Sequence, residues 1–286
     1  MDLKRWIKVA AAKTVGRWTA PFTPARSVVL CYHSISVEKS SLATPPDLFE
    51  RHLRWLKEHC RVVPFGSIFD TFMAGEGELA AVAITFDDGY ANNYEQAFPL
   101  LRKYDLPATF FLTVGLLEKQ PGVVARLRVR TQGGSQDLRP LTWPQVLEMR
   151  RGGMEIGAHS LTHRKLARLN REDVEVELKR SKQVIEQHLG EPVTLMSYPY
   201  GVPGRHFRSE ITDMVTEAGY EFAASILFKG VQPRCSKLNV PRFPADHDSL
   251  DTLRDKVHGA WDLVGLWQEK GPLWMARVLS PRQFRA

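Results

Sequence analysis

"VAITFDDGYANNYEQ", residues 82–96, joins an apolar run to a pair of carboxylates and then to a helical pattern. The run before the carboxylates is typical of a strand that is buried on both faces of a sheet. Gly89 lets the chain turn, and the helical pattern begins near Asn92. Asp87 and Asp88 repel each other and add nothing to a core, so they indicate binding or catalysis at the end of this strand.

The same alternation of short apolar strands and amphipathic helices continues along the chain. Strands are predicted at residues 27–33, 61–65, 82–86, 108–113, 154–158, 193–198 and 221–225. Helices are predicted near residues 47–60, 92–104, 142–151, 170–189 and 207–218. This order predicts an α/β protein with a mainly parallel sheet, either open or closed into a barrel. In both forms, polar residues at the C-terminal ends of the strands meet on one face, where active sites form.

The length allows one large α/β domain or two small ones, and the uninterrupted pattern of strands and helices favours one catalytic domain. The chain has 286 residues, of which 43% are hydrophobic. We expect the catalytic domain over residues 27–248 and a C-terminal helical extension over residues 249–286. No apolar run reaches the roughly 18 residues that a membrane-spanning helix needs. The absence of a clear secretory signal and the three cysteines without metal-type spacing favour a reducing cytoplasm.

Charge points to an anionic partner. Residues 1–26 form a basic amphipathic pattern, which predicts peripheral contact with the inner membrane; a helix packed on the domain explains it equally well. The net charge is +7, but the basic residues are spread along the chain and form no nucleic-acid-binding motif, so no nucleic acid is expected. The densest basic stretch, residues 125–140, is either a solvated loop or a contact for an acidic substrate.

A pair of histidines follows another predicted strand end. In "MEIGAHSLTH", residues 154–163, the strand ends at Ala158 and is followed by His159 and His163. A spacing of four residues would place both imidazoles on one face of a helical turn, within reach of one metal ion. Two histidines and one aspartate would leave coordination positions open, as a catalytic site requires. One carboxylate could then bind the metal while its neighbour accepts a proton; the residues alone do not assign these roles.

Three segments resemble, in order, the motifs of the NodB-homology polysaccharide deacetylase family: "TFDDGY" (85–90), "HSLTH" (159–163) and "SYPYG" (197–201). "VVLCYHSIS" (28–36) resembles the first strand of the branch that acts on poly-N-acetylglucosamine. The resemblance covers roughly residues 28–260 and implies a distorted (β/α) barrel of the polysaccharide deacetylase type. It also implies a metal-dependent hydrolase that removes an N-acetyl group from an amino sugar in a polysaccharide or a glycan precursor.

The resemblance also implies a role for individual residues. Asp88, His159 and His163 would hold a divalent metal, most often zinc, although cobalt, nickel and manganese also accept this ligand set. Asp87 would be the general base that activates metal-bound water. The backbone N–H of Tyr200 would help to stabilise the oxyanion.

The chain departs from the family pattern at two places. The third motif lacks the arginine that often orients the base, and Arg242 in "VPRFPAD" is a candidate replacement. The late histidine that serves as the acid has no clear match. His33, at the end of the first predicted strand, is the preferred candidate, with a structural histidine as the equal alternative. His247 and His258 are weaker candidates.

Tyr90 and Tyr200 could contact sugar rings, or either could simply pack in the protein interior.

Two other functions stay open beside the leading one. The substrate could be a lipid-linked sugar intermediate at the inner membrane face, or the protein could be a non-catalytic carbohydrate-binding protein on the same fold. The intact pairs of aspartates and histidines argue against the second, because a binding protein needs no hydrolytic base. The expected partner is therefore an N-acetylated glycan or a lipid-linked sugar.

Overall fold

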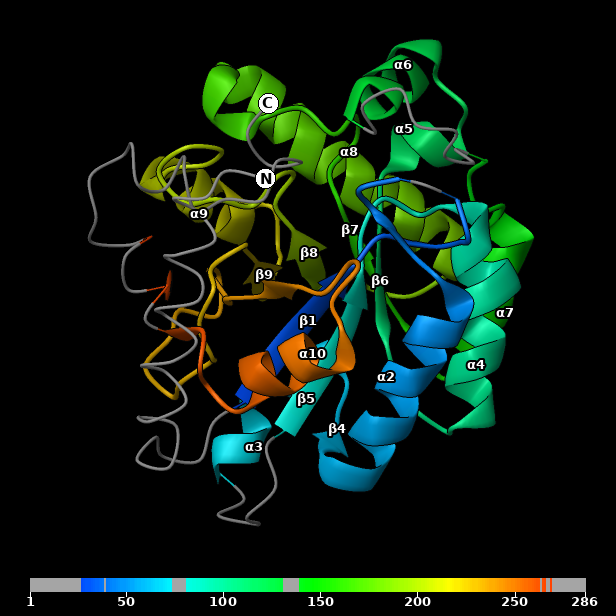
Figure 1. Ribbon diagram of the computed structural model, residues 1–286. Helices are drawn as coiled ribbons and strands as arrows, with labels where there is room; N and C mark the ends of the chain where they lie inside the picture. Colours follow the sequence, from blue (N-terminus) through cyan, green and yellow to red (C-terminus); the bar gives the residue numbers. More distant parts are fainter. Residues whose placement is uncertain are drawn as a thin grey trace.

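The computed structural model describes residues 27–38, 40–73, 81–130, 139–262, 264–265 and 268 (Figure 1). The amphipathic segment 1–26, positions 131–138 of the basic stretch and most of the predicted C-terminal extension therefore lie outside the described residues. Among the helices that are described, none is long and apolar enough to cross a membrane.

A parallel sheet forms the centre of the fold. Its strands are β1 (Ser27–Tyr32), β4 (Arg61–Val62), β5 (Ala81–Phe86), β6 (Thr109–Leu112), β7 (Glu155–Ala158), β8 (Leu195–Ser197), β9 (Phe222–Ala224) and β10 (Phe243–Pro244). They follow the order β10-β1-β5-β6-β7-β8-β9, with β4 also paired to β5, and the paired strands run parallel. The short strands β2 (Ser34–Ile35) and β3 (Ala43–Thr44) form a separate pair.

Residues 240–244 close the sheet into a distorted barrel. Val240 forms a parallel bridge with Ala224 of β9, and Phe243 pairs with Leu30 of β1. This closing segment, which includes β10, therefore lies between β9 and β1. The predicted (β/α) barrel is confirmed.

Helices cover the outside of the sheet (Figure 1). They are α2 (Pro46–His59), α3 (Asp70–Met73), α4 (Phe98–Lys103), α5 (Val114–Leu117), α6 (Pro121–Arg130), α7 (Trp143–Arg151), α8 (Arg171–Leu189), α9 (Ser209–Glu217) and α10 (Leu250–Val257). The longest, α8, begins where the Asn170 side chain accepts a hydrogen bond from the backbone N–H of Asp173, and ends at Gly190 with φ of 72°.

Two predicted elements differ from the structure. The strand expected at 61–65 is only Arg61–Val62, because Pro64 cannot donate to the ladder and a 3-10 turn begins at Phe65. The helix expected at 92–104 starts as a π-helical turn, Asn93–Ala97, before α4. The remaining predicted elements are present, most of them shorter by a few residues.

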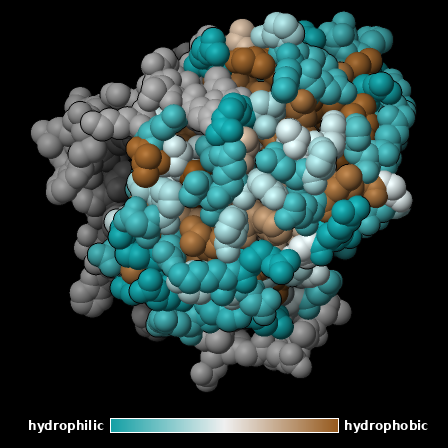
Figure 2. Space-filling model, turned by 90° about the vertical axis from the view of Figure 1, so that its right-hand side faces the viewer, coloured by the Kyte–Doolittle hydropathy of each residue, from teal (hydrophilic) through white to brown (hydrophobic). Residues whose placement is uncertain are grey.

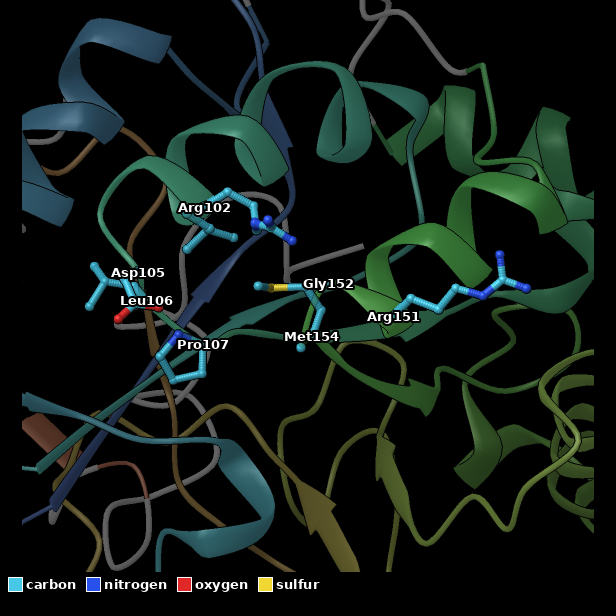
Figure 3. Close-up of a pocket in the computed structure, with 9 residues that line it drawn as sticks. Arg102, Asp105, Leu106, Pro107, Arg151, Gly152 and Met154 are labelled. Atoms are coloured by element: carbon cyan, nitrogen blue, oxygen red, sulfur yellow. The ribbon is translucent and has the colours of Figure 1, made fainter.

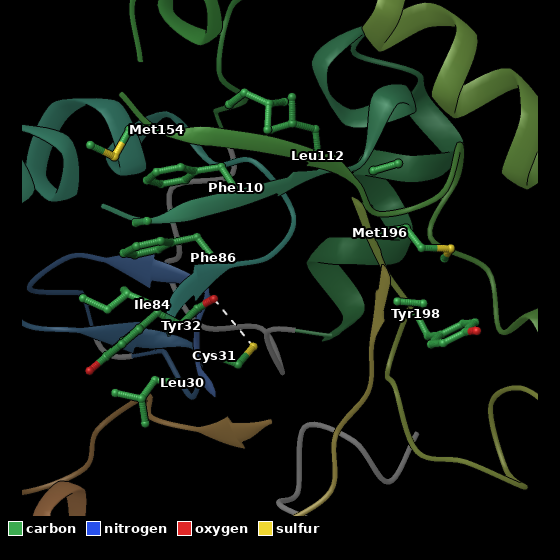
Figure 4. Close-up of a cluster of buried hydrophobic side chains, with 14 of the residues drawn as sticks. Leu30, Cys31, Tyr32, Ile84, Phe86, Phe110, Leu112, Met154, Met196 and Tyr198 are labelled. Atoms are coloured by element: carbon green, nitrogen blue, oxygen red, sulfur yellow. Dashed lines mark hydrogen bonds between the residues drawn. The ribbon is translucent and has the colours of Figure 1, made fainter. Parts of the chain in front are cut away.

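Aromatic rings pack along one face of the central strands (Figure 4). Phe86 of β5 stacks on Phe110 of β6 with ring centroids 4.6 Å apart, and on Tyr32 of β1 at 5.6 Å. All three rings are buried. His33 directly follows Tyr32, and Asp87 directly follows Phe86. Packing of the two rings in the core therefore fixes the backbone positions of these two polar residues.

The outer surface is polar. Figure 2 shows the face near α4 and α7 as mostly hydrophilic, with hydrophobic residues scattered singly or in small groups. Such scattering is ordinary for a protein surface and indicates no large apolar docking patch on this face.

Candidate active site

Asp88, His159 and His163 meet at the C-terminal ends of β5 and β7. The Oδ1 atom of Asp88 lies 3.3 Å from Nε2 of His163 and 3.6 Å from Nε2 of His159. All three residues are at most 1% exposed. The Asp88 side chain points toward the histidines, and its backbone has a left-handed φ of 75°. It therefore points away from its sequence neighbour Asp87, which contacts other residues.

The histidine pair is not on a helix, so the predicted helical turn is wrong. Residues 159–163 form a bend in which Ser160 and His163 have φ of 63° and 56°. These left-handed residues, and not a helical repeat, bring the two imidazole rings to 5.0 Å. The two histidines do lie close together, but the four-residue spacing on a helical turn is not the reason.

The donor set fits a divalent metal. Nδ1 of His159 donates a hydrogen bond to the carbonyl oxygen of Ser197 at 2.8 Å, because a carbonyl can only accept. In the neutral imidazole, Nε2 then presents a lone pair toward the Asp88 carboxylate. Two acceptors that face each other in a buried site are unfavourable unless a cation lies between them. Asp88, His159 and His163 can supply ligand atoms within 4.8 Å of one another.

Helix α8 supports the bend that carries His163. The buried carboxylate of Glu177 accepts a hydrogen bond from the backbone N–H of Thr162 at 2.8 Å and another from its hydroxyl group. The backbone carbonyl of Glu177 accepts from the N–H of Leu161 at 3.1 Å. One residue of α8 therefore holds both sides of the strained bend.

Asp87 faces the closing segment. Arg242 donates to both carboxylate oxygens of Asp87 at 2.8 Å, and also to the hydroxyl groups of Ser197 at 2.6 Å and Thr85 at 3.0 Å. Arg242 is fully buried. Burial by itself would raise the pKa of Asp87, but the Arg242 guanidinium outweighs it, and His159 and His33 act in the same direction as Arg242. The pKa of Asp87 is therefore held well below its usual range, and the carboxyl group is ionised.

His33 lies on the same side of the site as Asp87. Its Nδ1 atom is 2.8 Å from Oδ2 of Asp246, and its backbone N–H donates to Oδ1 of the same carboxylate at 3.0 Å. His33 is fully buried and can supply an atom within 4.8 Å of Asp87 and Cys31. This places His33 beside the predicted base.

The two weaker acid candidates lie at the surface. His247 is exposed and contacts the carbonyl oxygen of Ser40. His258 is exposed at the end of α10, with its ring 5.9 Å from that of Trp55. Neither histidine is buried against a carboxylate as His33 is against Asp246.

The two tyrosines differ in their surroundings. Tyr90 is fully buried in a hydrophobic cluster with Leu116, Val123 and Leu127. This is the packing role that the sequence left open beside a sugar contact. The ring of Tyr200 lies 4.8 Å from that of His163, and the residue has φ of 63°. Tyr200 is therefore placed next to the candidate metal centre.

Sequence reasoning missed Ser197, Asp246 and Glu177. Ser197 contacts both halves of the site, because its carbonyl oxygen orients His159 while its hydroxyl group accepts from Arg242. It belongs to the quoted "SYPYG" segment, so its position was a usable signal. Asp246 and Glu177 follow no spacing rule that would distinguish them from other acidic residues.

A surface pocket lies at the opposite end of the strands (Figure 3). Its volume is about 550 Å³, and residues that immediately precede β6 and β7 help to line it, among them Pro107, Gly152 and Met154. The candidate catalytic residues follow the C-terminal ends of β5 and β7 instead. In a parallel barrel, chemistry belongs to the C-terminal ends, so this pocket is not the active site.

Known proteins resemble the chain in sequence and in fold. YxkH of Bacillus subtilis (strain 168) is 29% identical over 210 residues, which are 73% of this chain and 67% of its relative. The poly-beta-1,6-N-acetyl-D-glucosamine N-deacetylase of Staphylococcus aureus (strain COL) is 22% identical over 238 residues, 80% of this chain and 76% of its own.

Solved structures share the same barrel. The Streptococcus pyogenes deacetylase PplD, in complex with acetate, superposes with a TM-score of 0.69 at 23% identity, covering 82% of this chain and 99% of PplD. IcaB from Ammonifex degensii gives 0.66 at 22% identity, covering 82% and 98%. The family described as "Polysaccharide deacetylase" matches residues 74–223, more than half of the chain. The protein belongs to the polysaccharide deacetylase family of hydrolases.

Proposed function

We propose that this protein removes the N-acetyl group from an amino sugar in a polysaccharide or a glycan precursor, in a metal-dependent hydrolysis. One observation carries the proposal: Asp87 and Asp88 are neighbours in sequence, yet one is paired to a buried arginine and the other faces two imidazoles. The Staphylococcus aureus relative is a poly-beta-1,6-N-acetyl-D-glucosamine N-deacetylase, which supports this choice of substrate class.

Asp88, His159 and His163 would hold the divalent metal, and zinc fits this ligand set, as do cobalt, nickel and manganese. When bound, such an ion supplies Lewis-acid polarisation of the acyl carbonyl and makes a nearby water more acidic. Ser197 keeps the metal-binding nitrogen of His159 unprotonated by accepting the hydrogen of the other ring nitrogen.

Asp87 acts as the general base. Arg242 keeps its carboxylate ionised at neutral pH and fixes its orientation through two hydrogen bonds. A carboxylate has lone pairs beyond the two that Arg242 uses, so Asp87 can still accept a proton from the attacking water. Arg242 is thus a positioning residue for the base.

His33 delivers the proton that the leaving amine needs. An amide nitrogen is a poor leaving group as an anion, so the C–N bond breaks as a proton is transferred to the nitrogen. Asp246 accepts a hydrogen bond from Nδ1–H of His33 and so orients the ring; as the proton donor, the imidazolium form would give up the hydrogen on Nε2. The products are acetate and a free amine, with the backbone N–H of Tyr200 proposed to donate to the oxyanion during the reaction.

Two finer questions belong to the same proposal. A lipid-linked sugar intermediate remains the alternative substrate, with peripheral contact at the inner membrane face through residues 1–26, which lie outside the described residues. A non-catalytic carbohydrate-binding role is less favoured, because a buried arginine that keeps an aspartate ionised serves a base and not a sugar contact.

The proposal is tested by acetate release from N-acetylated β-1,6-glucosamine oligosaccharides. We expect release with added zinc or cobalt, loss of release in excess chelator, and recovery when the metal is returned. Undiminished release after verified metal removal would exclude the metal-dependent mechanism. The absence of release from this and other N-acetylated glycans under all metal conditions would exclude the function itself.

A further inference from the structure

Residues 113–115, which follow β6, lie between the two motifs of the candidate metal centre. Strand β6 pairs with β5 on one side and with β7 on the other, so the residue after β6 lies between the residues that follow those two strands. This residue is Thr113, and its side chain is fully buried. No step of the proposed hydrolysis uses it.

Thr113 donates to the backbone of two proposed metal ligands. Its N–H donates to the carbonyl oxygen of Asp88 at 3.2 Å, and its hydroxyl group donates to the carbonyl oxygen of His159 at 3.4 Å. The direction of both bonds is fixed, because a carbonyl oxygen can only accept. A single residue therefore connects a ligand after β5 to a ligand after β7, although these strands are not neighbours in the sheet.

The next two residues hold the carbonyl groups of the bend between the two histidines. The N–H of Val114 donates to the carbonyl oxygen of Ser160 at 3.4 Å, and the N–H of Gly115 donates to that of Leu161 at 2.7 Å. Glu177 of α8 accepts from N–H groups of the same bend. Both kinds of backbone group in the bend are therefore held by other parts of the protein, which keeps its left-handed residues in place.

A side chain larger than glycine does not fit at position 115 unless the bend moves. A β-carbon on Gly115 would lie 2.8 Å from the carbonyl oxygen of Leu161, 2.9 Å from Oε1 of Gln120 and 2.9 Å from Cγ2 of Val123. The Gln120 side chain can rotate away, but the carbonyl oxygen belongs to the backbone of the bend. Gly122 of α6 is a contrast, because a β-carbon there meets nothing within 4 Å.

We propose that Thr113 and Gly115 are positioning residues for the metal, which hold the ligand segments after β5 and β7 in register and so set the affinity for the divalent ion. Both act through the backbone of these segments and not as ligands. The inference rests on the proposed function, because it assumes that Asp88, His159 and His163 bind the metal. Changes just outside the ligands of a metal commonly alter its affinity by about 10- to 100-fold.

The experiment measures zinc binding by the metal-free, full-length protein in competition with a chromogenic chelator. Gly115→Ala is matched by Gly122→Ala, which adds the same methyl group in open space. Thr113→Val is matched by Thr216→Val, which removes a hydroxyl group that also donates to a backbone carbonyl at 3.4 Å, but on the exposed side of α9. Thr113→Ser keeps the hydroxyl group. Urea unfolding of each metal-free variant is measured in parallel.

We expect Gly115→Ala to weaken zinc binding about 10- to 100-fold, because the added methyl group displaces the Leu161 carbonyl and the bend with it. Thr113→Val should weaken it about three- to tenfold, the effect of losing one hydrogen bond between neutral groups. Thr113→Ser should restore most of this loss. Gly122→Ala and Thr216→Val should bind zinc as tightly as the unaltered protein.

Unchanged zinc affinity in Gly115→Ala and Thr113→Val would overturn the inference, and so would an equal loss in the two matched controls. Lower stability to urea with unchanged zinc affinity would show a structural role only, which also overturns it. If Gly115→Ala does not fold, the comparison of Thr113→Val with Thr113→Ser decides.

Zinc binding is measured without a substrate, so this inference and the proposed function can fail separately. Weaker zinc binding in the variants at positions 113 and 115 supports the inference even if the unaltered protein releases no acetate from any glycan. Acetate release with equal zinc affinity in every variant keeps the proposed function and overturns the inference. Absence of zinc binding in the unaltered protein would overturn both.

Discussion

The two sides of the active site are built in different ways. On the base side, next to β1 and the closing segment, each ionisable group already has a partner inside the protein: Asp87 has Arg242, and His33 has Asp246. On the metal side, next to β7, the Asp88 carboxylate faces imidazole nitrogens. The base side is thus complete in the protein alone, whereas the metal side is proposed to be completed by a cation. Substitutions on the base side should therefore lower the free energy of unfolding, and substitutions of the ligands on the metal side should lower the metal content.

The largest expected effect separates the neighbouring carboxylates. Asp88→Asn should lose bound metal and with it essentially all turnover, because a carboxamide is a poor ligand for zinc. Asp87→Asn should retain the metal and lose about 10²- to 10⁴-fold in turnover, the range for a general base. Metal content and acetate release are measured on the same samples. Equal metal loss in both variants would show that the two sides are not distinct.

Removal of the buried arginine should be the largest effect on stability. Arg242→Met leaves the Asp87 carboxylate buried without its partner, and we expect a loss of about 3–5 kcal/mol in the free energy of unfolding. The double variant Arg242→Met/Asp87→Asn should regain part of it, because no unpaired charge is left. The measurement is urea unfolding. Arg171→Met, which breaks an exposed pair, is the control and should cost less than about 1 kcal/mol.

The proposed proton donor, His33, can be removed without changing a proposed metal ligand. His33→Ala should lose about 10²-fold or more in turnover and keep its metal. Asp246→Asn should have a smaller effect on turnover, since it removes the carboxylate that orients the His33 ring. Near-normal turnover of His33→Ala with an unchanged pH profile would reassign the proton donor.

The smallest effect concerns acid stability at the base side. His52 of α2 contacts the Asp248 carbonyl oxygen, near the residue that pairs with His33, and burial lowers its pKa to about 4. Between pH 6.5 and 4 the unfolded chain binds a proton that the folded protein does not, so stability falls with falling pH by at most about 1.4 kcal/mol per pH unit. Unfolding midpoints at pH 7 and pH 5 should differ less in His52→Gln. An identical pH dependence would reject this role.

The sequence predicts the metal side better than the base side. Asp88, His159 and His163 could be named because each lies in a short contiguous motif that follows a strand, and parallel strand ends meet on one face. The local geometry was less accessible: left-handed residues, and not a helix, orient the histidines. Such backbone conformations depend on support from elsewhere, here from Glu177 of α8.

The base side depends on the closure of the barrel. Asp87 and Arg242 are 155 residues apart, and His33 and Asp246 are 213 residues apart. Arg242 could be suggested as a replacement for a missing arginine, but nothing in its neighbours indicates a bidentate pair. Asp246 was not identified, because a single acidic residue in a polar loop has no pattern of its own. Only the register of β10 beside β1 brings these residues to the site.

The closing segment also sets an order of events during protein synthesis. A ribosome-bound chain that has emerged as far as β9 already contains both motifs for the metal but lacks the cation that neutralises Asp87. Contacts of long sequence separation form slowly, and the pairs of Asp87 with Arg242 and of His33 with Asp246 are contacts of this kind. The residues proposed to bind the metal can therefore come together before the proposed base, Asp87, gains its arginine partner. Activity thus begins only when the end of the barrel docks against its beginning.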